Sequence, residues 1–245
     1  MHPLQNRSIH SQYPPGSVYK IAVAYAALEE GVVNPETTIY CPGHFKLGRG
    51  RYRCWKKRGH GAVNLHDALV QSCDVYFYTV GHRMGIDTLA SYAKKLGFGM
   101  PTGLGLSREK SGLVPSTKWK LKNRKEAWLL GETISASIGQ GYNLVTPLQQ
   151  ANMMAAVANG GMLLKPYLVK RIEEPGGKII KEFFPKIKGR ITGNPENMEI
   201  IRNALRDVVN GTRGTGKKSR LKDVVVSGKT GTVQVVRMKS NEELE

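Results

Sequence analysis

Hydrophobic residues near the start of the chain recur with helical spacing. The apolar positions that share one helix face are Ile21, Ala24, Tyr25 and Leu28. This pattern predicts a helix that begins at Ser17 and ends before Gly31. Similar patterns predict a short helix over residues 64–70 and a second over residues 75–84, which Gly85 stops. The first third of the chain is therefore expected to be largely helical, apart from residues 41–61, which are rich in Gly and Arg and predict an irregular loop.

Two later helices are predicted from their capping residues. Thr146 is a typical N-cap, Pro147 suits the first helical position, and Gln149 completes a capping box, so a helix is expected up to about Ala158. Asn194 caps a further helix over residues 195–209. Both predictions depend only on residues close together in sequence.

Strands are predicted mainly toward the end of the chain. Residues 167–169 and 178–180 flank a Pro-Gly-Gly turn at 175–177 and predict a hairpin. Residues 224–226 form an apolar run that leads into 227–232, and residues 233–236 are expected to continue as a strand. Helices in the middle with strands at the end indicate an α+β fold, a helical subdomain plus an antiparallel sheet.

Composition limits the class of protein. The chain has 245 residues, of which 40% are hydrophobic, and a formal net charge of +18. This length supports one sizeable core, and the charge favours anionic partners such as nucleic acid, anionic lipid or carboxylate-rich polymers. No apolar run approaches the roughly 18 residues that a membrane span needs. No basic stripe interleaved with aromatic residues is present, so we expect no nucleic-acid partner.

A serine and a lysine three residues apart are the first candidate chemistry. Ser17 and Lys20 share one helix face, so the lysine amine can lie near the serine hydroxyl. A serine becomes nucleophilic when a neighbouring base accepts its proton, and a desolvated lysine can do so. The pair alone is weak evidence, because this spacing is common in helices with a solvated lysine.

Two further motifs strengthen the interpretation of Ser17 as a nucleophile and Lys20 as its base. The segment Lys229-Thr230-Gly231 follows an apolar run, and its glycine lets a ligand approach closely. The segment Ser72-Cys73-Asp74 lies at a helix junction, where its polar side chains can face a cleft. In this order the three motifs resemble the set Ser-x-x-Lys, Ser-Asp-Asn and Lys-Thr-Gly of penicillin-binding proteins and class A β-lactamases.

Three cysteines form a separate group of candidate ligands. An odd number does not favour a disulfide framework, whereas three thiolates and one imidazole make a closed tetrahedral zinc site. Cys41, Cys54 and Cys73 would supply the sulfurs, with His60 or the competing His44 as the fourth ligand. A Cys41–Cys54 disulfide, or simply buried thiols, are equally compatible with the sequence.

The sequence resembles class B penicillin-binding proteins, and most closely the elongation-type group. The segments that carry the resemblance span nearly the whole chain: 13–20, 55–61, 72–78, 139–147 and 227–232. It implies that residues 1–245 form a transpeptidase domain of the serine β-lactamase-like fold, truncated at both ends. Most relatives carry Asn where this chain has Asp74, a departure that the elongation-type group shares.

The resemblance also implies a role for each motif residue. Ser17 would be the acyl-ester nucleophile and Lys20 its base, while Ser72 would relay a proton to the leaving amine and Asp74 would orient it. Backbone N–H groups of Ser17 and Thr232 would form the oxyanion hole. The residues that would bind the carboxylate of a D-Ala-D-Ala stem peptide are Lys229, Thr230, Gly231 and Thr232. β-Lactam antibiotics would acylate the same serine.

Zinc is the cofactor that the resemblance implies. Some of the elongation-type relatives that this chain resembles bind zinc at the positions of the cysteines and histidine discussed above. Their ligands are Asp in the first two positions, followed by His and Cys. Here those first two positions are Cys41 and Cys54, so residues 41–61 would be a zinc-binding loop region inserted between the first two motifs. The implied ligands are Cys41, Cys54, His60 and Cys73.

Three other functions compete with this interpretation of the sequence. A nucleotide-binding loop at residues 211–218 fails, because Lys218 stands where Ser or Thr must hold magnesium. A β-lactamase or β-lactam sensor on the same fold is the nearest enzyme-class alternative. A basic domain that binds anionic polymers is the alternative without catalysis.

The resemblance finally implies where the parent protein works. A single N-terminal helix, absent from this chain, would anchor it in the inner membrane, with the catalytic domain in the periplasm. The resemblance suggests a glycan polymerase of the rod-shape system as its partner.

Overall fold

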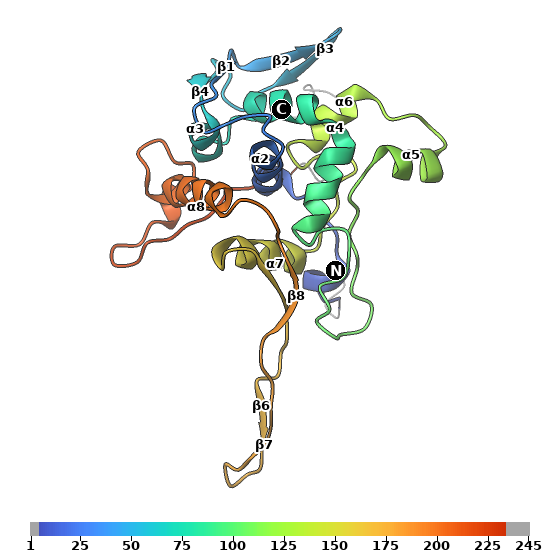
Figure 1. Cartoon of the computed structure of the whole chain (residues 1–245), viewed down its shortest axis with the longest axis vertical. Helices are drawn as coiled ribbons and strands as arrows, with labels where there is room; N and C mark the ends of the chain where they lie inside the picture. The colour runs from blue at the N-terminus through green and yellow to red at the C-terminus, as the bar shows by residue number, and fades with distance from the viewer. Residues whose placement is uncertain (1–4, 234–245) are drawn as a thin grey trace, which may run out of the picture.

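A helix buried on every side lies at the centre of the structure, a computed structural model that describes residues 5–233. This helix, α2 (Lys20–Glu29), is buried at every position from Lys20 to Leu28. A helix without a polar face is stable only inside a protein, and α2 is surrounded by α3 (Leu65–Val70), α4 (Asp74–Lys95) and α8 (Pro195–Asn210) (Figure 1). The predicted helix thus exists, but its α-helical part begins at Lys20, after a 3-10 turn over Gly16–Tyr19.

The two predictions made from capping residues are confirmed. Asn194 caps α8, and Thr146 and Gln149 form the capping box of α7 (Pro147–Ala158). The short helix predicted over residues 64–70 is α3, which Asn64 caps. The remaining helices were not predicted: α1 (Arg7–His10), α5 (Thr117–Arg124), α6 (Leu130–Ala136) and a 3-10 turn at Lys217–Ser219.

Gly85 interrupts α4 but does not end it. Its φ of 76° and ψ of 164° are non-helical, and a second helical stretch follows directly. The apolar residues Ile86, Leu89 and Ala93 of that stretch are buried at helical spacing. The glycine therefore re-aims the chain between two helical pieces.

About half of residues 41–61 lie in strands, so the expectation of an irregular loop is wrong for this part and holds only for residues 54–60. Strand β1 (Ile39–Cys41) pairs with β4 (Gly61–Val63), and β2 (His44–Leu47) pairs with β3 (Gly50–Arg53), both antiparallel. Phe45 and Tyr52 are cross-strand partners, and both rings pack against Tyr78 of α4. Aromatic cross-strand pairs stabilise hairpins, and here they fix this one on the helical body.

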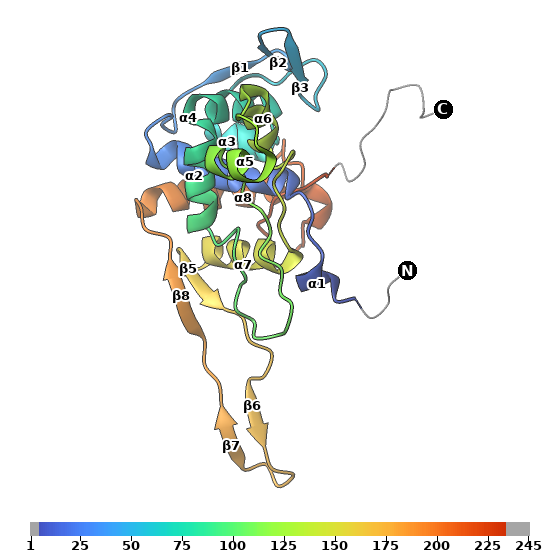
Figure 2. The same ribbon diagram turned by 90° about the vertical axis from the view of Figure 1, so that its right-hand side faces the viewer.

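A two-stranded arm projects from the helical body (Figure 2). At its base β5 (Met162–Lys165) pairs with β8 (Lys186–Arg190), and at its tip β6 (Arg171–Glu173) pairs with β7 (Ile179–Glu182). The predicted turn at 175–177 is confirmed, but the predicted strand at 167–169 is wrong. Pro166 and Pro185 stand at the gap between the two paired stretches, where they lack the N–H that a ladder requires.

The predicted strand at residues 224–226 is also wrong. Within the described residues this segment has no strand partner. The Asn210 side chain donates to the Val226 carbonyl at 2.8 Å, and just beyond the segment the Gly228 N–H donates to the Leu205 carbonyl at 3.0 Å. Helix α8 thus provides the hydrogen-bond partners of Val226 and Gly228. The predicted strand at 233–236 lies outside the described residues beyond Val233.

The α+β class is confirmed, with a helical body and antiparallel strands. The expected sheet is replaced, within residues 5–233, by four two-stranded sheets. None of the helices in this described range is both long and apolar enough to span a membrane.

Candidate active site

Ser17 lies on the 3-10 turn that leads into α2. The preceding Gly16 has a φ of 57°, and its N–H donates to the Gly139 carbonyl at 3.0 Å. A Cβ atom at Gly16 would lie 2.6 Å from the Thr232 carbonyl oxygen. Glycine is therefore required for the backbone of the third motif to approach the turn that carries Ser17.

Lys20 connects the first motif to the second. Its Nζ is fully buried and donates to the Ser72 carbonyl at 3.0 Å, to Ser72 Oγ at 3.2 Å and to Asp74 Oδ1 at 2.6 Å. These three acceptors match the three donors of an ammonium group. Because all three donors are used in this way, the described residues show no hydrogen bond between the Lys20 amine and the Ser17 hydroxyl, where the sequence had led us to expect the amine.

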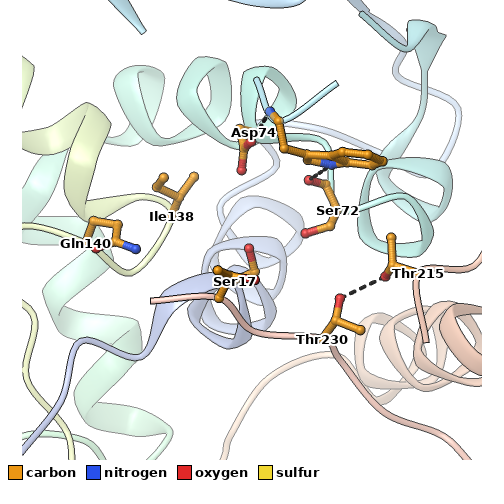
Figure 3. Close-up of a pocket in the computed structure, with 9 residues that line it drawn as sticks. Ser17, Ser72, Asp74, Ile138, Gln140, Thr215 and Thr230 are labelled. Atoms are coloured by element: carbon orange, nitrogen blue, oxygen red, sulfur yellow. Dashed lines mark hydrogen bonds between the residues drawn. The ribbon is translucent and has the colours of Figure 1, made fainter. Parts of the chain in front are cut away.

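Ser72 is held in an unusual backbone conformation at the junction of α3 and α4. Its φ of 54° is left-handed, which is costly for a residue with a Cβ atom. The Trp55 indole N–H donates to the Ser72 carbonyl at 3.1 Å, and the Trp55 backbone N–H donates to Asp74 Oδ2 at 2.9 Å. These bonds hold the second motif so that the Ser72 and Ser17 hydroxyls point toward each other (Figure 3).

The third motif runs past the Ser17 turn as an extended segment. A Cβ atom at Gly231 would lie 3.2 Å from a Val18 methyl group, so the glycine lets this segment pack closely against the turn that carries Ser17. Lys229 Nζ donates to the Thr230 carbonyl at 3.2 Å. Burial, reinforced by the positive charge of Lys20, lowers the pKa of Lys229 to about 7. Part of the Lys229 population is thus uncharged at neutral pH.

The three motifs meet at one cavity of about 470 Å³. It is lined by Ser17, Trp55, Ser72, Asp74, Ile138, Gln140, Thr215, Thr230 and Thr232. Four of these residues have no individual role predicted from the sequence: Trp55, Ile138, Gln140 and Thr215. Trp55 and Gln140 stand in segments that carried the family resemblance, whereas Thr215 appeared only within the rejected nucleotide-binding run.

The candidate metal ligands Cys41, Cys54, His60 and Cys73 lie together beside the second motif. Their ligand atoms all lie within 4.8 Å of one another. His60 Nδ1 lies 3.5 Å from the sulfurs of both Cys41 and Cys54, and all three cysteines are buried free thiols. The pairing of β1 with β4 places His60 here, whereas His44 lies on β2 and contacts Arg51.

The chemistry of this cluster fits a bound cation. Hydrogen bonding to Cys73 lowers the pKa of the Cys54 thiol, while the same hydrogen bond and burial raise that of Cys73. Burial also raises the pKa of Cys41. Without a cation, the negative charge of one buried thiolate therefore disfavours deprotonation of the other cysteines. Zinc would offset this repulsion, because it binds sulfur in its deprotonated form.

Fold and cavity together place the chain among active-site serine proteins built on an α+β body. The chain belongs to the penicillin binding protein transpeptidase domain family, whose profile matches residues 1–245. It is 40% identical to the peptidoglycan D,D-transpeptidase MrdA of Haemophilus influenzae, an alignment that covers 98% of this chain and 37% of that protein. The chain thus spans little more than a third of the length of this curated relative.

Solved structures agree with this assignment. The crystal structure of Pseudomonas aeruginosa PBP2 in complex with WCK 5153 is 39% identical, with a TM-score of 0.85, over 95% of this chain and 53% of that one. A peptidoglycan synthase complex described as coordinating polymerization and crosslinking contains a chain that is 36% identical, with a TM-score of 0.82, over 94% of this chain and 38% of that one. The expected transpeptidase-domain fold is confirmed.

Proposed function

We propose that this chain is the catalytic part of a peptidoglycan D,D-transpeptidase, which cross-links stem peptides through an acyl-serine intermediate during cell-wall elongation. The observation that carries the proposal is the convergence of Ser17, Ser72 and Thr230, from three distant segments, on one cavity. The similarity to MrdA supports the choice of reaction.

In the first half of the reaction, Ser17 Oγ attacks the carbonyl carbon of the penultimate D-Ala. The Lys20 ammonium first releases one proton to solvent, and the resulting amine accepts the hydroxyl proton. The negative charge that develops on the carbonyl oxygen is stabilised by backbone N–H groups of Ser17 and Thr232. The bond to the terminal D-Ala breaks, and Ser72, which contacts Lys20 Nζ, passes a proton to the departing amine.

In the second half, the amine of a neighbouring stem peptide attacks the acyl ester. A new peptide bond forms, the bond to Ser17 Oγ breaks, and the serine recovers a proton from the attacking amine through the same residues. A β-lactam follows only the first half, because its cleaved amide remains tethered within the opened ring. Lys229 and the hydroxyls of Thr230 and Thr232 would bind the ligand carboxylate.

Covalent labelling tests the proposal. Incubated with a fluorescent penicillin and run on a denaturing gel, the wild type should carry label, and Ser17→Ala should carry none. Ser219→Ala, at an exposed serine outside the cavity, is the matched control and should label normally. Equal labelling of Ser17→Ala would overturn the proposal. An acyl-enzyme that hydrolyses within seconds would favour the β-lactamase alternative instead.

A structural zinc ion is the second part of the proposal. Cys41, Cys54 and Cys73 through sulfur, and His60 through Nδ1, would hold it, and the spacing of these atoms supports that set. When bound, zinc would serve as a closed four-coordinate cross-link. Since Cys73 stands between Ser72 and Asp74, this cross-link would steady the second motif.

The location and partner of the parent protein complete the proposal. It would be anchored in the inner membrane by a segment outside this chain, with the catalytic domain in the periplasm and a rod-shape glycan polymerase as partner. The similarity to a peptidoglycan synthase complex supports this partner. Co-purification of the full-length protein with the polymerase from detergent-solubilised membranes tests it, and consistent recovery of the two proteins in separate fractions would count against it.

A further inference from the structure

Thr215 lines the cavity but has no role in the proposed reaction. Its Oγ1 lies 2.9 Å from Thr230 Oγ1, the hydroxyl expected to face a ligand carboxylate (Figure 3). The backbone N–H of Thr215 donates to the Val70 carbonyl at 3.3 Å. The Thr215 hydroxyl can also donate its proton to that carbonyl, at 3.4 Å, but Thr230 Oγ1 is the nearer acceptor.

The loop that carries Thr215 is fastened to α3 and α8. Arg213 Nη2 donates to both carboxylate oxygens of Asp67 on α3, each at 3.0 Å. The Gly216 N–H donates to the Val208 carbonyl on α8 at 2.8 Å. Thr215 is therefore held from both sides, and α3 leads directly into the second motif.

The direction of the hydrogen bond between the two threonines decides what Thr230 can do. A hydroxyl has one proton. If Thr215 donates to Thr230, the Thr230 proton is free for a ligand carboxylate; if Thr230 donates to Thr215, its proton is used. An anion in the cavity favours the first arrangement, because a chain of hydrogen bonds that all point toward the negative charge is mutually reinforcing.

We propose that Thr215 is a positioning residue, which donates its hydroxyl proton to Thr230 and so turns the Thr230 proton toward the carboxylate of the ligand. This proposal rests on the proposed function, since it assumes that Thr230 faces that carboxylate. Thr215 touches no reacting atom. It sets the preference of the site for carboxylate-bearing ligands.

The experiment compares acylation by a penicillin with acylation by its methyl ester, which keeps the reactive ring but lacks the charged carboxylate. Thr215→Val preserves the shape of the side chain and removes the hydroxyl, so the ratio of the two second-order acylation rates should fall by about threefold to tenfold, as for one neutral hydrogen bond. Thr215→Ser should restore the ratio. Arg213→Gln, which loosens the loop but keeps the hydroxyl, should change both rates together.

The outcomes separate this inference from the proposed function. An unacylated wild type, or an acylated Ser17→Ala, would overturn the function itself. A normally acylated wild type with an unchanged ratio in Thr215→Val would overturn only the inference. If Thr215→Val loses stability in thermal unfolding, the pair Thr215→Ser and Thr215→Ala differs by the hydroxyl alone, and equal ratios in that pair would also refute it.

Discussion

The ion pair between Lys20 and Asp74 allows a quantitative prediction. Asp74 is almost fully buried, and its two oxygens serve different donors: Oδ1 accepts from Lys20 Nζ at 2.6 Å, and Oδ2 accepts from the Trp55 backbone N–H at 2.9 Å. Asp74→Asn keeps one oxygen and replaces the other with an NH₂ group, which is itself a donor. Asp74→Ala removes both acceptors.

The two substitutions should differ in cost. Both substitutions leave the buried Lys20 ammonium without a counter-ion, and breaking a buried pair in this way costs about 3–5 kcal/mol. Asn still accepts from one of the two donors, whereas Ala accepts from neither, so Ala should cost more than Asn by about 1.5–3 kcal/mol, the value of one hydrogen bond to a charged group. Against a typical total stability of about 5–15 kcal/mol, the Ala variant should be close to unfolding.

Urea unfolding followed by circular dichroism measures these differences, with Asp223→Asn as the control at an exposed carboxylate. The control should lie within about 0.5 kcal/mol of wild type. Labelling by penicillin should fall in Asp74→Asn, because Trp55 and Lys20 no longer hold the second motif together. If Ala is no more costly than Asn, or Asn no more costly than the control, the ion pair does not stabilise the fold as reasoned.

Three further predictions follow from the same cavity and its supports. The lowered pKa of Lys229 means that its positive charge is lost as pH rises through about 7, which weakens its attraction for a carboxylate. Acylation by a carboxylate-bearing penicillin should therefore slow between about pH 6 and 8. A pH–rate profile checks this, and a flat profile would refute it. Cys73→Ser should lower both the zinc content by elemental analysis and the melting temperature, whereas His44→Ala, outside the cluster, should change neither. Gly139→Ala should destabilise the protein by more than the about 1–2 kcal/mol that a left-handed backbone costs a residue with a Cβ atom, because this Cβ would also collide with the Gly16 carbonyl oxygen. Gly31 is also left-handed but has open space around it, so Gly31→Ala should cost only the backbone strain. Equal denaturation midpoints of the two variants would contradict the steric argument.

The elements that could be predicted from the sequence are those whose signals are local. The capping box of Thr146 and Gln149 and the cap at Asn194 require only residues within one turn, and both helices were found. A strand needs a partner, which its own residues do not specify. Residues 224–226 have the composition of a strand, yet the partner of the Val226 carbonyl is a side chain of α8 rather than another strand.

The site shows the same limit. The spacing of Ser17 and Lys20 identified the pair, but the direction of the Lys20 amine depends on Ser72 and Asp74, which are distant in sequence. The choice between His60 and His44 was open until strand pairing placed one of them beside Cys41. Thr215 has no sequence signal of its own, since its importance comes entirely from its neighbours.

The cavity is walled by residues from opposite ends of the described chain, with Ser17 near its beginning and Thr230 near its end. If synthesis is halted before Thr230 leaves the ribosome, the nascent chain lacks one wall of the site. This holds even when its central helices have already formed. Covalent capture of an antibiotic by ribosome-bound chains of increasing length would therefore report the moment at which the two ends first meet.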